Sequence, residues 1–78
     1  MSLKSKFAHE IFHARTKLGL TQQQVADAVS ISVRWYQHIE KGTNLPGSIV
    51  ILRLFIFLDL DLHAFREEAE IIVPISSR

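Results

Sequence analysis

The stretch Leu20–Gly42, LTQQQVADAVSISVRWYQHIEKG, is the most informative part of the chain. Its apolar spacing predicts two short helices joined by a tight turn, one over about 22–29 and one over about 33–41. Thr21 and Ser32 are suitable N-cap residues, because a hydroxyl can accept a hydrogen bond from an unpaired amide of the first turn. Two helices joined in this way let a protein insert one helix into the DNA major groove while the other braces it.

The second of these helices has an apolar and a polar face. Tyr36 and Ile39 are three residues apart and belong to the buried face, with Val29 of the preceding helix. The opposite face carries the side chains that we expect to contact base edges: Val33, Arg34, Gln37 and His38. Arg and Gln suit this task because each can form two hydrogen bonds to one base. For His38, an ordinary surface histidine is the alternative interpretation.

This segment resembles the DNA-binding domain of the Cro and lambda-type repressor family, the XRE-like proteins. That family begins its second helix with Thr-Gln, has a small Ala within it and ends its third helix with Ile-Glu-x-Gly. The matching residues here are Thr21-Gln22, Ala26 and Ile39-Glu40-Lys41-Gly42. Flanking matches extend the resemblance over about residues 7–65: Ile11, Ala14, Arg15, Leu18, Gly19, Leu20, Pro46, Ile51, Leu52, Leu58, Leu60, Leu62 and Phe65.

The resemblance implies an all-α, five-helix lambda-repressor-like domain and further contacts. DNA-backbone contacts are expected from the start of helix 2, the cap of helix 3 and the loop after it: Gln22, Ser32, Lys41, Thr43 and Asn44. For the loop residues Lys41, Thr43 and Asn44, the alternative is a polar loop that has no role in binding. Trp35 either stacks on the DNA backbone or packs on a flank of the core. Two positions depart from the family: Ser30 and Asp59 stand where glycine is usual.

A first helix is predicted over about Ser5–Leu18, with an apolar stripe formed by Phe7, Ile11, Ala14 and Leu18. By the resemblance, Arg15 pairs with Glu40. An acid at the end of a helix opposes the helix dipole, so it needs a partner. The alternative is an arginine that faces solvent.

The segment Ser48–Leu58, SIVILRLFIFL, is apolar almost all round. It is shorter than the roughly 20 residues that span a membrane. We expect four of its residues in the core: Ile51, Leu52, Phe55 and Leu58. Three others are expected to face outward: Ile49, Val50 and Ile56. Such a patch is rarely left exposed, so either a second subunit or the tail of the chain should cover it.

The tail, residues 66–78, contains the β-branched run Ile71-Ile72-Val73-Pro74-Ile75, which is typical of a short strand or extended arm. A frayed terminus is the alternative. Packing of the tail within one subunit and packing between two subunits both stay open. The predicted dimer interface combines this run with the fourth predicted helix, over 48–58: Ile49, Val50, Ile56, Ile71, Ile72 and Val73.

Length and composition restrict the class of protein. The 78 residues suggest one small domain over 1–65 and a tail over 66–78. Residues 1–58 contain seven Lys or Arg and three acidic residues, a balance of +4, whereas residues 59–78 have a balance of −3. A basic half that contains the two helices favours DNA, although ordinary surface scatter gives the same numbers. No cysteine and no signal peptide are visible, which predicts a cytoplasmic protein without disulfides.

No glycine-rich phosphate loop, cysteine nucleophile or carboxylate pair is visible, so we expect no enzyme, no cofactor and no metal. The prediction is a sequence-specific regulator of transcription that binds double-stranded DNA as a homodimer on an inverted repeat. Repression by occlusion is the simplest mechanism, and activation uses the same module. The alternative is a protein-interaction module, such as an antitoxin or anti-repressor, that uses the apolar segment 48–58 and the tail.

Overall fold

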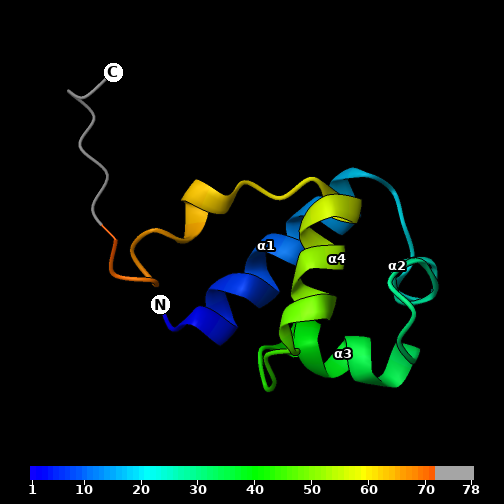
Figure 1. Ribbon diagram of the computed structural model, residues 1–78. Coiled ribbons are helices and arrows are strands. Elements are labelled where there is room, and N and C mark those ends of the chain that lie inside the picture. The colour runs from blue at the N-terminus through cyan, green and yellow to red at the C-terminus, as the bar shows by residue number, and fades with distance from the viewer. Residues whose placement is uncertain (72–78) are drawn as a thin grey trace.

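The computed structural model describes residues 1–71, which form four α-helices and one short 3-10 helix (Figure 1). The elements are α1 (Leu3–Lys17), α2 (Gln22–Ala28), α3 (Val33–Lys41), α4 (Ser48–Leu58) and the 3-10 helix η1 (Leu62–Phe65). Helix α1 packs against α3 and α4, and α2 packs against α3. The all-α prediction is correct for this part of the chain, which contains no strand, but the expected fifth α-helix is only a 3-10 turn.

Side-chain caps begin three of the helices. Ser2 accepts a hydrogen bond from the Ser5 amide, so α1 begins two residues earlier than predicted. At α2, Thr21 and Gln24 form the reciprocal capping box, with bonds of 3.1 Å and 2.8 Å. Ser32 accepts from the Trp35 amide at α3. These local bonds set the starts of α2 and α3 as the sequence predicted.

The core lies where α1, α2, α3 and α4 meet. Its largest fully buried side chains are Tyr36, Ile11, Ile39, Leu54, Val25 and Val29. The rings of Phe7, Phe55 and Phe65 join α1, α4 and η1, with centroids 5.3–6.0 Å apart. Leu18 does not continue the buried stripe of α1 and is 54% exposed, because α1 ends at Lys17 and the chain then turns away.

Within residues 1–71, left-handed backbone occurs at three residues other than glycine: Glu70, with φ of 58°, and two residues in turns that follow helices. Ser30, between α2 and α3, has φ of 63°, and Asp59, after α4, has φ of 54°. Both are the positions at which the family usually carries glycine. A side chain with a Cβ atom is strained in this conformation, although Asp tolerates it better than most residues. Both turns therefore keep a left-handed backbone without glycine, at a local energetic cost.

Helix α4 is turned slightly from the predicted orientation: Ile51, Phe55 and Leu58 lie in or against the core as predicted, but Leu52 does not. Leu54 and Leu58 are buried, whereas Leu52, predicted in the core, is 57% exposed. Val50, predicted to face outward, is half-buried and packs against the core. A helix that is apolar on all sides has no polar face to define its orientation. Packing against α1 and the aromatic rings decides it instead.

After η1, residues 66–70, which precede the predicted arm, form turns. The amide of Ala69 bonds the carbonyl of Phe65, and the amide of Ile71 bonds that of Arg66. Ile71 is 59% exposed and belongs to no strand. The rest of the predicted arm, with Ile72 and Val73, lies outside the described residues. No helix within residues 1–71 is long and apolar enough to cross a membrane.

Candidate nucleic-acid interface

The exposed face of α3 brings together three of the four predicted base-contacting residues. Arg34, Gln37 and His38 line one shallow hollow, together with Lys41 from the predicted backbone set. All four side chains are exposed, while Tyr36 and Ile39 bury the opposite side of the helix. The face thus offers two cations, an amide and an imidazole to a partner, on a helix that is held from behind.

Val33 does not belong to this face, contrary to the prediction. Its side chain is half-buried and packs against the core at the first turn of α3. Trp35 is also half-buried against the core, which favours the second of its two interpretations. Its ring lies beside that of His38, with centroids 6.5 Å apart. An apolar side chain at the edge of the exposed face can either face outward or pack on the core, and sequence spacing alone does not distinguish the two.

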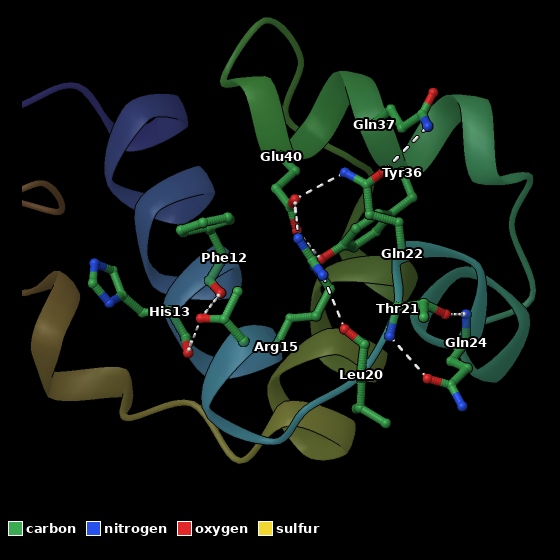
Figure 2. A network of polar contacts seen from close by, with 11 residues as sticks. Phe12, His13, Arg15, Leu20, Thr21, Gln22, Gln24, Tyr36, Gln37 and Glu40 are labelled. Atoms are coloured by element: carbon green, nitrogen blue, oxygen red, sulfur yellow. Dashed lines mark hydrogen bonds and ion pairs between the residues drawn. The ribbon is translucent and has the colours of Figure 1, made fainter.

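Behind the exposed face, Arg15 of α1 and Glu40 of α3 form the ion pair that the resemblance implied (Figure 2). Arg15 Nε and Nη2 donate to the two oxygens of Glu40 at 2.8 Å and 2.9 Å. Arg15 Nη1 also donates to the carbonyl of Leu20 at 2.9 Å. The two side chains are only 13% and 7% exposed. A bidentate pair with little solvent access fixes both orientation and distance between α1 and α3.

The Glu40 carboxylate accepts two further hydrogen bonds, from Tyr36 Oη and from Gln22 Nε2. Burial by itself would raise the pKa of Glu40, but the bonds from Arg15, Tyr36 and Gln22 outweigh it and lower the pKa. The bond from Glu40 and its charge raise the pKa of Arg15, which burial opposes. Burial, followed by the bond to Glu40, raises the pKa of Tyr36, so the phenol stays neutral. Glu40 is thus the ionised centre of the network.

Gln22 joins this buried network to the exposed face. Its Nε2 donates to Glu40 at 2.9 Å, and its Oε1 accepts from Gln37 Nε2 at 3.2 Å (Figure 2). The sequence pointed to Gln22 only as a DNA-backbone contact, because residues 15 positions apart show no pairing signal. The Tyr36–Glu40 contact, in contrast, follows from i,i+4 spacing on α3 and could have been predicted.

Phe12 is a surface residue that sequence reasoning missed. Its ring is 46% exposed and lies 5.6 Å from the Arg15 guanidinium. It lines a second hollow on the same side of the molecule, next to the network: Phe12, Gln22, Gln37, Glu40 and Lys41. An exposed phenylalanine in the middle of α1 carries no sequence signal for this place, because only the packing of α1 against α3 brings it there.

The remaining predicted backbone-contacting residues lie at the ends of α3. Ser32 uses its hydroxyl as the N-cap. The Thr43 hydroxyl lies 2.9 Å from the carbonyl of His38 and 3.1 Å from Oδ1 of Asn44, so it closes the last turn of α3. Lys41 and Asn44 are exposed. Thr43 therefore has a structural role in addition to any contact with a ligand.

Of the residues predicted at a dimer interface, Ile49 and Ile56 of α4 are 58% and 81% exposed. Leu52, also exposed, lies between them. These three residues form an apolar α4 stripe on the outer surface of the helix. Ile71 is exposed as well, whereas Val50 packs inward.

Within residues 1–71 no three His, Asp or Glu side chains gather as a metal site would require. The exposed rings of His9 and His13 lie against each other on α1, with centroids 4.3 Å apart. Two imidazoles without a third ligand do not make a metal centre of the usual kind.

Comparison with known proteins agrees with this architecture. The helix-turn-helix family model matches residues 11–65, from α1 to the end of η1. A solved structure, the restriction-modification controller protein C.AhdI from Aeromonas hydrophila, shares the fold with a TM-score of 0.69 and 24% sequence identity, covering 78% of this chain and 92% of that one. A comparison with curated proteins gives no match. The chain belongs to the XRE-type helix-turn-helix family of DNA-binding transcription regulators.

Proposed function

We propose that this chain binds a specific double-stranded DNA sequence by placing α3 in the major groove. The observation that carries the proposal is the exposed face of α3, where Arg34, Gln37, His38 and Lys41 stand together on a helix anchored from behind by Glu40. A recognition helix must present donors and acceptors to base edges and hold a fixed orientation while doing so. Arg34, Gln37 and His38 contact bases, and Lys41 contacts phosphate.

The protein acts on an inverted-repeat operator as a homodimer and represses by occlusion. The apolar α4 stripe supports dimerisation, because a surface with Ile49, Leu52 and Ile56 exposed is costly to leave in water. A two-fold dimer would place its recognition helices about one DNA turn, roughly 34 Å, apart. The likeness to a restriction-modification controller supports a regulatory role of this kind.

Selection from a random duplex library, with purified protein at moderate salt, tests the proposal. We expect enrichment of a palindrome with half-sites one helical turn apart. Arg34→Ala should then weaken binding to the selected duplex by about 1–3 kcal/mol and relax one position of the site. Lys41→Ala is the matched variant, and should weaken binding to all duplexes about equally. A uniform loss for Arg34→Ala would reassign this residue to the backbone.

Sedimentation equilibrium tests the dimer. Ile56→Lys places a charge in the middle of the apolar α4 stripe and should raise the dimer dissociation constant at least tenfold, since an unpaired interfacial charge is costly to desolvate. Leu18→Lys is the control, because Leu18 is 54% exposed at the C-terminal end of α1 and is not part of the apolar α4 stripe. Equal effects of the two substitutions would contradict a dimer formed through α4.

The second candidate is a protein-interaction module, an antitoxin or anti-repressor, and the apolar α4 stripe is the observation that favours it. In that case the folded protein would be a monomer at high concentration and would enrich no duplex. Its α4 would be covered by a different protein chain instead of a second copy.

A further inference from the structure

The ionised Glu40 carboxylate determines the direction of two amide groups. A carboxylate only accepts hydrogen bonds, so the Gln22 amide must turn its Nε2 toward Glu40, at 2.9 Å. The Oε1 of Gln22 then faces α3. Gln37 meets it with Nε2, at 3.2 Å. Reversal of either amide would place two acceptors or two donors against each other. Because Glu40 can only accept hydrogen bonds, it sets the orientation of the Gln22 amide, and Gln22 in turn sets that of the exposed Gln37 amide.

Among residues 1–71, one N–H and the Oε1 atom of Gln37 have no partner in this arrangement. Figure 2 shows the Gln37 oxygen on the side of the amide that points away from Gln22. The residue lies on the exposed face of α3, in the hollow lined by Arg34 and Lys41. A free donor and a free acceptor on one planar amide complement N7 and N6 of adenine in the major groove.

We infer that Glu40 and Gln22 position the Gln37 amide so that Gln37 selects adenine at one base pair of the operator half-site. The inference rests on the proposed function and adds to it the base that this position prefers and the two residues that impose the preference. Gln22 and Glu40 are positioning residues in this scheme, and Gln37 alone contacts the base. A glutamine free to rotate would offer its donor and acceptor in either order and would discriminate less between bases.

Binding to single-base variants of the library-selected duplex tests the inference. Gln37→Ala first identifies the base pair concerned, as the position at which discrimination disappears. For the wild-type protein, replacing adenine there should weaken binding on the order of tenfold or more. Gln22→Met keeps the length of the side chain and leaves the Arg15–Glu40 pair intact, but removes the link. We expect it to reduce the adenine preference several-fold at that base pair and at no other.

Gln23→Met is the matched control on the same helix. In the part of the chain that the structure describes, the Gln23 side chain bonds Asp27 alone, one turn away, so its loss should leave discrimination at all positions unchanged. A lost phosphate contact of Gln22 would lower the affinity for every duplex equally. The ratio of affinities at the Gln37 base pair therefore separates positioning from backbone contact.

NMR of the free protein provides a readout that needs no DNA. The side-chain amide signals of Gln37 should move in Gln22→Met and stay in place in Gln23→Met. Unmoved Gln37 signals, or an adenine preference that survives Gln22→Met, would overturn the relay while the proposed function stands. A wild-type protein that enriches no duplex at all would overturn the proposed function and the adenine assignment together. A preference for guanine at the Gln37 position would overturn the assignment alone.

Discussion

The two sides of α1 are held to the rest of the molecule in different ways. Toward α3, contact is directional: Arg15, Glu40, Tyr36 and Gln22 each have a defined polar partner. Toward α4, contact is apolar, through rings such as those of Phe7 and Phe55. Hydrogen bonds require fixed angles, whereas apolar packing depends mainly on area and shape. Polar bonds therefore add directional constraints to the packing of α3 on α1, whereas α4 contributes mostly buried apolar surface.

The difference extends to the outer faces of the two helices. Helix α3 presents polar side chains to its surroundings, while α4 presents Ile49, Leu52 and Ile56. Water hydrates a polar face when no ligand is bound, so its exposure has no energetic cost. An apolar face of this kind is costly to expose to water, and it therefore favours association with another chain. This difference is the basis of our proposal that α3 recognises DNA and that the apolar α4 stripe mediates association.

Removing the centre of the polar network should have the largest effect. Glu40→Ala leaves the nearly buried Arg15 guanidinium without a counter-charge, and should reduce the free energy of unfolding by about 3–4 kcal/mol. Urea denaturation followed by circular dichroism measures it. Glu10→Ala is the control, since the Lys6–Glu10 pair at 3.3 Å is partly exposed on α1 and should contribute less than about 1 kcal/mol. Similar losses of stability in both variants would mean that the Arg15–Glu40 pair contributes no more than the exposed Lys6–Glu10 pair.

Two leucine-to-alanine substitutions in α4 test its apolar packing. Leu54→Ala should cost about 3 kcal/mol, because Leu54 is fully buried and its loss leaves a cavity. Leu52→Ala, two residues earlier on the outer face, should change the stability of the monomer by less than about 0.5 kcal/mol. Denaturation at low protein concentration separates monomer stability from association. A larger loss for Leu52 than for Leu54 would mean that the helix has the phase predicted from sequence.

Acid should weaken the α1–α3 contact before it affects α4. The pKa of Glu40 is lowered in the folded protein from its ordinary value of 4.5. Its contribution to stability is complete above about pH 4.5 and is lost as the pH falls through the lower folded pKa. Glu40→Gln should flatten this part of a stability profile measured by denaturation between pH 2 and pH 7. A wild-type profile with the same slope as the variant would contradict the assignment.

The smallest expected effect is at the turn between α2 and α3. Ser30→Gly should raise the free energy of unfolding by about 0.5–1 kcal/mol, because glycine removes the strain of φ 63° but loses more backbone entropy on folding. Thermal unfolding detects a change of this size. Ser30→Ala keeps the Cβ atom and should bring no gain. A gain for alanine equal to that for glycine would exclude strain as the cause.

Much of the fold and part of the site could be predicted. The caps Thr21 and Ser32 and the buried residues Tyr36 and Ile39 follow from short-range spacing, and they are confirmed. The prediction placed Val33 on the exposed face, but its side chain packs against the core. An apolar residue in the first turn of a helix can take either position, and spacing does not decide between them. Ser30 shows that a turn can keep its left-handed geometry when its glycine is absent.

What the sequence by itself determined is local: where α2 and α3 begin, where they bury apolar residues, and that α3 carries a polar face. These depend on hydrogen bonds and periodicities within a few residues. Only the tertiary structure decided the phase of α4, the place of Phe12 beside α3 and the link from Glu40 through Gln22 to Gln37. These features join residues distant in the sequence, and their geometry exists only after the helices have packed.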